Sequence, residues 1–213
     1  MEASNKRELQ KAETRQTILD AAIDGFASFG FDGTNFREIT QRCGADRSLI
    51  LYHFKSKENL WKAAVEKVEQ RFTEHFEAGY QPASQTLVDD RARIGYLMSS
   101  FIDALIDVPA YGQILLREGG GEGPRTEWLA RHFAPRAALD IQLDNPEIMR
   151  RVQQTLLRDI LGSVMVSFIA LGPLMDRSLA LVTGKAAAGI HPLNTTNKQA
   201  FIDYLLAMVF SGY

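Results

Sequence analysis

The sequence predicts an all-α protein in which a short N-terminal helix-turn-helix domain of three helices precedes a longer helical C-terminal domain. Two features of the 213 residues support this. Apolar residues recur at steps of three and four in almost every periodic segment, which is the spacing of one helix face. No segment of useful length alternates apolar and polar residues as a half-buried strand does.

The first helix is expected from Thr14 onwards. Ile18, Phe26 and Phe29 lie on one apolar stripe of this segment, and Gly30 is expected to end it. Three further helices follow, each after a residue that caps helices well: 36–42 after Thr34, 47–54 after Asp46, and 57–79 after Ser56. Gln81–Ser84, which includes a proline, is the clearest boundary in the chain.

Helical periods resume after this boundary. The expected helices cover 87–106, 109–117, 124–141, 146–171 and 198–210, with Asn145-Pro146 as the cap and first position of the fourth. Residues 175–188 are compatible with another helix, and 189–197 with a loop. We therefore expect an N-terminal domain over 1–58 and a C-terminal domain over 59–213, connected by the helix 57–79.

Composition restricts the possible functions. The net charge of −2 excludes a generally basic protein, so any nucleic-acid surface has to be local. The single cysteine, Cys43, excludes an intrachain disulfide and fits a reducing compartment. The polar N-terminus has no signal-peptide pattern, and the longest uncharged apolar run, Ile160–Met175, is shorter than the roughly 20 residues of a membrane helix. We expect a cytoplasmic protein without a membrane partner.

The most informative motif joins the second and third helices. Cys43–Asp46 forms a four-residue turn with glycine between two short helices, which is the pattern of a helix-turn-helix. In that motif the second helix enters the major groove of DNA, led by its N-terminal side chains, here Arg47 and Ser48, with Leu51 and Tyr52 one turn later. Between Arg37 and Lys57 five basic residues face two acidic ones, so local charge agrees with DNA binding.

Residues 14–60 resemble the N-terminal domain of the TetR family of transcriptional regulators. The resemblance is carried by Arg15, Ile18, Ala21-Ala22, Phe29-Gly30-Phe31, Gly33-Thr34, Ile39, Gly44, and most specifically by Tyr52-His53-Phe54 followed by Ser56–Leu60. It implies phosphate contacts from Thr34, Tyr52, His53 and Lys57, and base or phosphate contacts from Arg37, Arg47 and Ser48.

Three positions depart from the family pattern. Ser48 replaces a frequent glycine, Leu51 a common tyrosine, and Ala45 the usual valine. Leu51 stays in the predicted DNA-binding set because it can contact a thymine methyl group. His53 is equally compatible with a buried structural role.

The resemblance also implies a C-terminal domain that dimerises and often encloses a small effector. Apolar and aromatic residues, with two polar anchors, are candidates for an effector pocket: Phe72, Met98, Phe101, Ile102, Leu105, Tyr111, Arg117, Glu118, Trp128, Phe133, Met165 and Phe168. Candidates for the dimer interface are Leu156, Ile160, Val164, Phe168, Phe201, Leu205, Met208 and Val209. Ordinary core packing is the favoured explanation for the pocket candidates, and it also fits the residues assigned to the dimer interface.

The expected function is a sequence-specific regulator, in the commoner family mode a repressor, that binds a palindromic operator as a homodimer and is released by a largely apolar effector. An activator without an effector, or a helical interaction module, are the alternatives. An enzyme is disfavoured. The Gly119–Gly123 run has no GK[ST] after it, the four histidines lack metal-ligand spacing, and no GxSxG occurs, so no metal or cofactor is expected.

Overall fold

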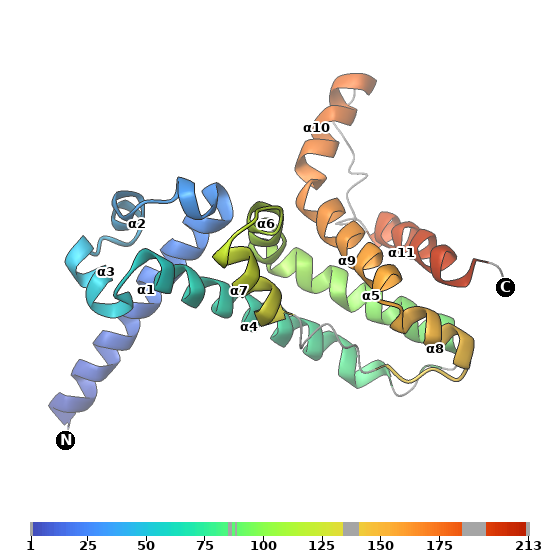
Figure 1. Ribbon diagram of the computed structural model, residues 1–213, viewed down its shortest axis with the longest axis horizontal. Helices are drawn as coiled ribbons and strands as arrows, with labels where there is room; N and C mark the ends of the chain where they lie inside the picture. The colour runs from blue at the N-terminus through green and yellow to red at the C-terminus, as the bar shows by residue number, and fades with distance from the viewer. Residues whose placement is uncertain (1, 85–86, 88, 134–140, 185–194, 212–213) are drawn as a thin grey trace. The chain divides into compact units, whose positions relative to one another are not determined.

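The protein is described by a computed structural model that covers residues 2–84, 87, 89–133, 141–184 and 195–211 (Figure 1). Within these residues the chain forms eleven α-helices and no strand, which confirms the predicted fold class. The chain divides into two compact units: residues 1–71 with 113–130, and residues 72–112 with 131–213. The domain boundary expected at residue 58 differs from this division, in which the first unit continues to residue 71 and includes residues 113–130. The proposed domains over 1–58 and 59–213 remain a prediction.

The N-terminal unit is organised around four helices. They are α1 (Glu2–Gly33), α2 (Phe36–Cys43), α3 (Arg47–Phe54) and the first half of α4 (Lys57–Ser84). Their shared core consists of side chains with almost no exposed surface: Ile18, Ala22, Phe26, Ile39, Ile50, Leu60 and Trp61. The end of α6 (Pro109–Glu118) and most of α7 (Pro124–Phe133) complete the unit, where Trp128 packs against Trp61 with 5.4 Å between ring centroids.

Helix α1 is kinked at Gly30, the residue expected to end it. Gly30 has φ 71° and ψ −179°, a combination that is essentially restricted to glycine, and the chain continues helically to Gly33. The kink exposes the amide of Phe31, which donates a hydrogen bond of 2.7 Å to Oε1 of Glu118. The expected stop is therefore a change of direction, held by a carboxylate from α6.

Gly30→Ala is expected to reduce the free energy of unfolding by about 1–3 kcal/mol, because the backbone conformation at residue 30 is strained for any residue that carries a Cβ. That Cβ also meets Oε1 of Glu118 at 3.2 Å. Gly44→Asn is the control, since Gly44 has φ 72° and ψ −4°, a left-handed conformation that asparagine tolerates, and a Cβ there meets nothing within 4 Å. Equal losses in chemical denaturation would contradict this account of Gly30.

The cap of α2 differs from the expectation. Asn35, not Thr34, is the N-cap, and its Oδ1 accepts a hydrogen bond of 3.0 Å from the amide of Glu38. Thr34 is fully buried, and its hydroxyl donates to the carbonyl of Gly30 at 2.8 Å. Thr34 thus closes the kink of α1 and leaves the cap to the next residue.

The second unit contains α5 (Asp90–Asp107), the start of α6, α8 (Pro146–Gln153), α9 (Thr155–Ala170), α10 (Gly172–Thr183) and α11 (Thr195–Phe210). Its core is one cluster that includes Phe72, Met98, Ile102, Leu105, Ile148, Met165, Ile202, Leu205 and Val209. The guanidinium of Arg151 fastens α8 to the end of α11, donating to the carbonyls of Val209 and Ser211 at 2.8 and 2.9 Å.

Several predicted boundaries in this half were wrong. Helix α4 continues past Gly79 to Ser84, and α10 and α11 begin three residues earlier than expected, at Gly172 and Thr195. The helix expected over 146–171 is divided by Gln154, which has φ −63° and ψ 120°. Ile141 lies outside any helix, and residues 134–140 and 185–194 lie outside the described residues.

Membrane-spanning potential in the described part of the chain is confined to one combination. No single helix there has both the length and the apolar character needed to cross a bilayer, although α9 and α10, which meet at a bend of 59°, pass that test together by length and composition only.

Candidate nucleic-acid interface

The turn between α2 and α3 is built by two end residues. Gly44 ends α2 in the left-handed conformation and donates its amide to the carbonyl of Thr40 at 2.8 Å. Asp46 caps α3, as predicted, by accepting from the amide of Leu49 at 2.8 Å. The hydroxyl of Ser48 donates to the same carboxylate at 2.6 Å. These hydrogen bonds, from Ser48 first and then Leu49, lower the pKa of Asp46, so the cap stays ionised at neutral pH.

Helix α3 is anchored through its buried side. Ile50 and Phe54 face the core with 0% and 4% of their surface exposed, and Ile39 of α2 is fully buried with them. The guanidinium of Arg15 lies over the ring of Phe54 at 4.8 Å from its centroid. The predicted anchoring role of Ile39, Ile50 and Phe54 is consistent with this packing.

The opposite side of α3 is open to solvent. Arg47, Ser48 and Tyr52 are exposed, and Leu51 is half-buried between them and the core. The guanidinium of Arg47 lies 5.3 Å from the ring centroid of Phe36, which leaves its donors available at the start of the helix. The N-terminal end of α3 therefore presents an arginine and a small hydroxyl residue, the side chains suited to base edges.

His53 is half-buried in a positive environment. Its ring stands edge-on to Tyr52 at 5.2 Å. Burial lowers the pKa of His53, and the charges of Lys11, Arg15 and Lys55 lower it further. The neutral imidazole is thus favoured in the folded protein, whereas a phosphate placed nearby would favour the charged form.

Stability is expected to fall as pH drops below about 6.5, in part through His53. Its pKa is lower in the folded than in the unfolded chain, so the unfolded chain binds more protons in that window and is stabilised relative to the folded chain as pH falls. Chemical denaturation at pH 7.5 and 5.5 should show a smaller loss for His53→Gln than for the wild type. An unchanged pH dependence in the variant would contradict the inferred environment of His53.

Lys57 lies at the start of α4 beside an aromatic ring. Its ammonium is 4.4 Å from the ring centroid of Phe31, and the guanidinium of Arg125 is 4.2 Å from the same centroid. Burial lowers the pKa of Lys57, while the carboxylate of Asp32 opposes that shift. The remaining predicted contacts differ in access, since Arg37 is exposed whereas Thr34 is fully buried. Burial leaves Thr34 no surface for a phosphate, so we omit it from the interface.

Three cations near Tyr52 and His53 were absent from the predicted set. The ammonium groups of Lys11 and Lys55 lie 5.3 and 5.6 Å from the Tyr52 ring centroid, and Arg15 lies over Phe54. Lys11 and Arg15 belong to α1. Their position could have been inferred from the sequence, because they lie seven and three residues before Ile18 and so share its helix face. Lys55 was counted in the local charge between Arg37 and Lys57 but was not predicted to contact DNA.

A small hollow adjoins the turn. It has a volume of about 270 Å³ and is lined by residues of α1, the turn and α3: Thr14, Thr17, Ile18, Cys43, Gly44, Ala45 and Leu49. Cys43, the single cysteine, is partly exposed there. The hollow carries no charged group.

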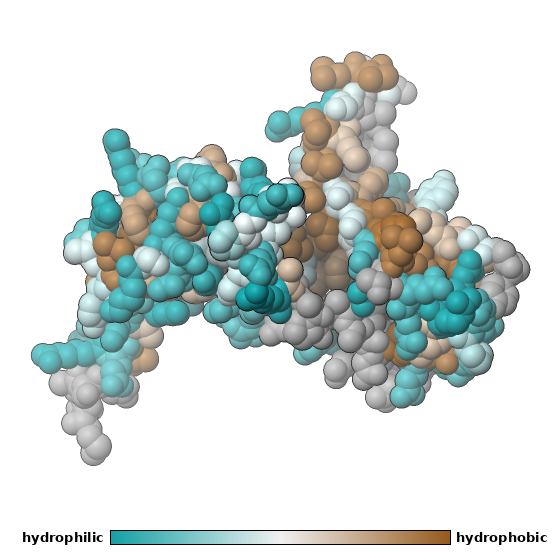
Figure 2. Space-filling view, viewed as in Figure 1, coloured by the Kyte–Doolittle hydropathy of each residue, from teal (hydrophilic) through white to brown (hydrophobic). Residues whose placement is uncertain are grey.

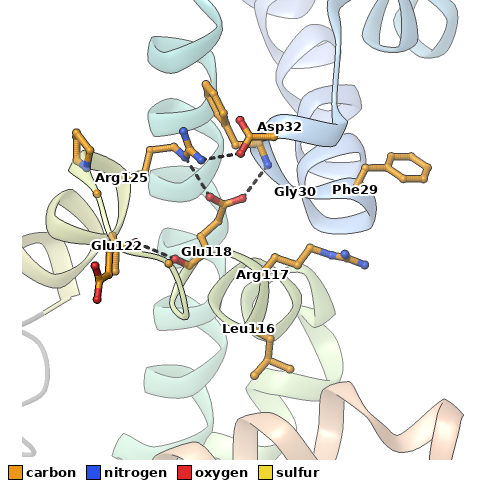
Figure 3. A pocket seen from close by; sticks show the side chains of 13 residues that line it. Phe29, Gly30, Asp32, Leu116, Arg117, Glu118, Glu122 and Arg125 are labelled. Atoms are coloured by element: carbon orange, nitrogen blue, oxygen red, sulfur yellow. Dashed lines mark hydrogen bonds and ion pairs between the residues drawn. The ribbon is translucent and has the colours of Figure 1, made fainter.

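A larger hollow of about 580 Å³ lies beside the Gly30 kink (Figure 3). The carboxylate of Glu118, 9% exposed, accepts from Phe31 and from Nε of Arg125 at 3.2 Å, and Arg125 also pairs with Asp32 at 2.9 Å. Nε of Arg117 donates to the carbonyl of Ala27 at 2.8 Å. Arg117 and Glu118, the predicted effector anchors, thus hold α6 against α1.

The other effector candidates are closely packed in the structure. In the second unit the rings of Phe72 and Tyr111 stack at 4.0 Å, and Phe101 stands edge-on to Phe72 at 5.1 Å. Met98, Ile102, Leu105 and Met165 are buried in the same core. Trp128 belongs to the N-terminal unit with Arg117 and Glu118, and the side chain of Phe133 lies outside the described residues.

The dimer candidates separate into two groups. Leu156, Ile160 and Val164, four residues apart on α9, have 73%, 39% and 36% of their surface exposed. On α11, Leu205 and Val209 have 2% and 0% of their surface exposed, so they pack in the core of this protomer, and their predicted place in a dimer interface stays a prediction. Among the described residues of α11, the large apolar side chains that are exposed are those of Met208 and the unpredicted Tyr204. Phe168 and Phe201 stack at 4.5 Å and join α9 to α11.

The capped turn, the buried anchor of α3 and its exposed N-terminal end define a helix-turn-helix segment. Residues 18–64 match the model of the family "Bacterial regulatory proteins, tetR family". Residues 18–64 therefore match the TetR family, and the described C-terminal half of the chain is helical.

Similarity to individual proteins agrees with this assignment. The chain is 34% identical over 68 residues to the HTH-type transcriptional regulator RutR of Escherichia coli K12, covering 32% of each chain. It is 30% identical over 95 residues to the HTH-type transcriptional activator FasR of Mycolicibacterium smegmatis, covering 45% of this chain and 42% of FasR. The matched segment thus spans about a third to two fifths of the length of these relatives.

Solved structures show the fold over a longer stretch. A putative fatty acid metabolism regulator of Clostridium perfringens superposes with a TM-score of 0.59 and 19% identity, covering 92% of this chain and 98% of that one. At this identity the likeness establishes the fold alone.

Proposed function

We propose that the protein is a sequence-specific DNA-binding transcription regulator that binds a palindromic operator as a homodimer. The observation that carries the proposal is the N-terminal end of α3, where Arg47 and Ser48 are exposed to solvent on a helix whose other side is buried in the core. Arginine donates bidentately to guanine, and the exposed phenol of Tyr52 and the ammonium of Lys57 suit the phosphate backbone.

The dimer supplies the second recognition helix. We place its interface on Leu156, Ile160 and Val164 of α9 with Tyr204 and Met208 of α11, because these apolar side chains are exposed in the protomer. A two-fold dimer of helix-turn-helix units reads half-sites about 34–36 Å apart or a multiple of that distance, which requires a palindromic site.

Regulation by a small, largely apolar effector is the second part of the proposal. The aromatic and aliphatic residues of the second unit around Phe72, Phe101 and Tyr111 would line the binding site of such a ligand after moving apart to admit it. A difference in ligand affinity of about 1–3 kcal/mol between two arrangements would change operator occupancy about 5–150-fold. The family's commoner mode predicts a repressor, and the similarity to the activator FasR supports activation as the alternative.

Selection of binding sites from random DNA tests the proposal. We expect a palindromic site, bound with an affinity that decreases steeply as salt rises. Recovery of no palindrome would contradict the proposed regulator and favour a helical interaction module.

Two variants separate base reading from backbone contact on the selected site. Arg47→Ala should relax the preference at one base position by about 1–3 kcal/mol, whereas Lys57→Ala should weaken binding to all sequences alike. Both are measured by fluorescence anisotropy against the operator and a scrambled duplex, with thermal unfolding as the check on folding. An equal loss of base preference in both variants would contradict the assigned roles.

A further inference from the structure

The N-terminal turns of α1 extend beyond the helix-turn-helix. Helix α1 begins at Glu2, and from Lys6 onwards, where its side chains are described, the first buried one is Ile18, so several turns project from the N-terminal unit (Figure 1). In the space-filling view the described part of this projection is mainly hydrophilic (Figure 2). The described side chains of this projection therefore do not pack in the core of the unit, so their arrangement of charges needs another explanation.

Arg7, Lys11 and Arg15 form a basic stripe along this projection. They are four residues apart, so they share one helix face, and all three are exposed. Ile18 and Ala22 continue the same face by steps of three and four and are fully buried in the N-terminal core. The basic stripe is thus the outward continuation of the face by which α1 packs on its neighbours.

Two contacts place the basic stripe beside the proposed DNA surface. The ammonium of Lys11 is 5.3 Å from the ring centroid of Tyr52, and the guanidinium of Arg15 is 4.8 Å from that of Phe54. The stripe therefore starts at the C-terminal end of α3 and leads away from it.

The charges of the basic stripe are available to a partner. None of Arg7, Lys11 and Arg15 forms an ion pair with any carboxylate among the side chains that the structure describes. Residues 6–15 contain four basic and two acidic residues, a net of +2, although the whole chain has a net charge of −2. A local positive face next to a DNA-binding helix complements the phosphate backbone.

We propose that Arg7 and Lys11 bind backbone phosphates of the DNA flanking each half-site, outside the stretch contacted by α2 and α3. This inference rests on the proposed DNA-binding function and extends its footprint. From Arg15 to Arg7 the helix rises about 12 Å. At 3.4 Å per base-pair step that length corresponds to about three to four base pairs of duplex.

The expected effect follows from counterion release. Each phosphate contact contributes about 0.9 to the slope of log K against log salt, which is about fivefold in affinity at 0.15 M salt. A dimer makes four contacts with Arg7 and Lys11, so Arg7→Gln/Lys11→Gln should reduce the magnitude of that slope by about 3 to 4. Arg15 is left unchanged, because its packing on Phe54 links it to stability.

The test crosses the protein variant with the length of the DNA. The selected palindrome is prepared as a minimal duplex and as one with four extra base pairs of unrelated sequence at each end, and affinities are measured by fluorescence anisotropy. Wild-type protein should bind the longer duplex at least tenfold more tightly. Arg7→Gln/Lys11→Gln should lose most of this gain, whereas Lys6→Gln, at another exposed lysine on a different face of α1, should keep it.

The outcomes are distinct. If wild type binds the palindrome but the double variant retains the gain from flanking DNA, the basic stripe does not contact DNA and the inference is overturned while the regulator stands. If selection from random DNA with the wild-type protein yields no binding site, the proposed function fails together with the inference. If the double variant keeps flank affinity but loses binding to vesicles rich in phosphatidylserine, the stripe serves an anionic membrane surface, which also overturns the inference.

Discussion

Leu156→Glu/Ile160→Glu is expected to convert the proposed dimer into a monomer whose operator affinity is at least a hundredfold lower. Both side chains are exposed in the protomer, so the fold should tolerate the change. In a two-fold interface each substitution meets its own copy or a near neighbour, which buries like charges. Loss of the second half-site then removes an advantage of about 10²–10⁴.

Sedimentation velocity and anisotropy on the same samples measure this effect. Leu181→Glu on α10 is the matched control, because Leu181 is 87% exposed and lies outside the α9 stripe. A dimeric double variant with intact DNA binding would show that another surface holds the copies together.

Ile50→Ala is expected to reduce the free energy of unfolding by about 2–5 kcal/mol and to weaken DNA binding. Ile50 is fully buried and, with Phe54, fixes α3 on its neighbours. The substitution removes buried carbon atoms and leaves a cavity under the recognition helix. Chemical denaturation measures the stability, and anisotropy on the operator measures the consequence for binding.

Tyr52→Ala is the matched control on the same helix. Tyr52 is 56% exposed, so its removal should change the free energy of unfolding by no more than about 0.5 kcal/mol while still lowering DNA affinity. A similar stability loss in both variants would mean that α3 is not anchored through Ile50.

The helix-turn-helix was predictable because its local signals agree. Asp46 and Ser56 cap the helices expected of them, and Gly44 takes the left-handed conformation that ends α2. The cap of α2 was not predictable locally, since Thr34 and Asn35 are both good caps. Burial of Thr34 under the kink decided between them, and burial depends on the tertiary fold.

The C-terminal half gave weaker signals. Residues 201–210 are apolar on almost every side, so periodicity could not show that Leu205 faces the core while Tyr204 and Met208 face outwards. The break at Gln154 has no proline or glycine at the dividing residue. The basic stripe on α1 was missed for another reason: acidic and basic residues balance over residues 1–58, and that count does not use the helical spacing of Arg7, Lys11 and Arg15.

Cys43 is a natural site for attaching a fluorescent label to this protein. It is the single thiol of the sequence, it is partly exposed at the end of α2, and the adjoining hollow of about 270 Å³ offers room for a small dye. A thiol-reactive fluorophore would therefore label one defined place, within a few residues of Arg47, without any engineered cysteine. Changes in its emission would follow the approach of DNA to the turn in real time, on the native chain and on every variant described above.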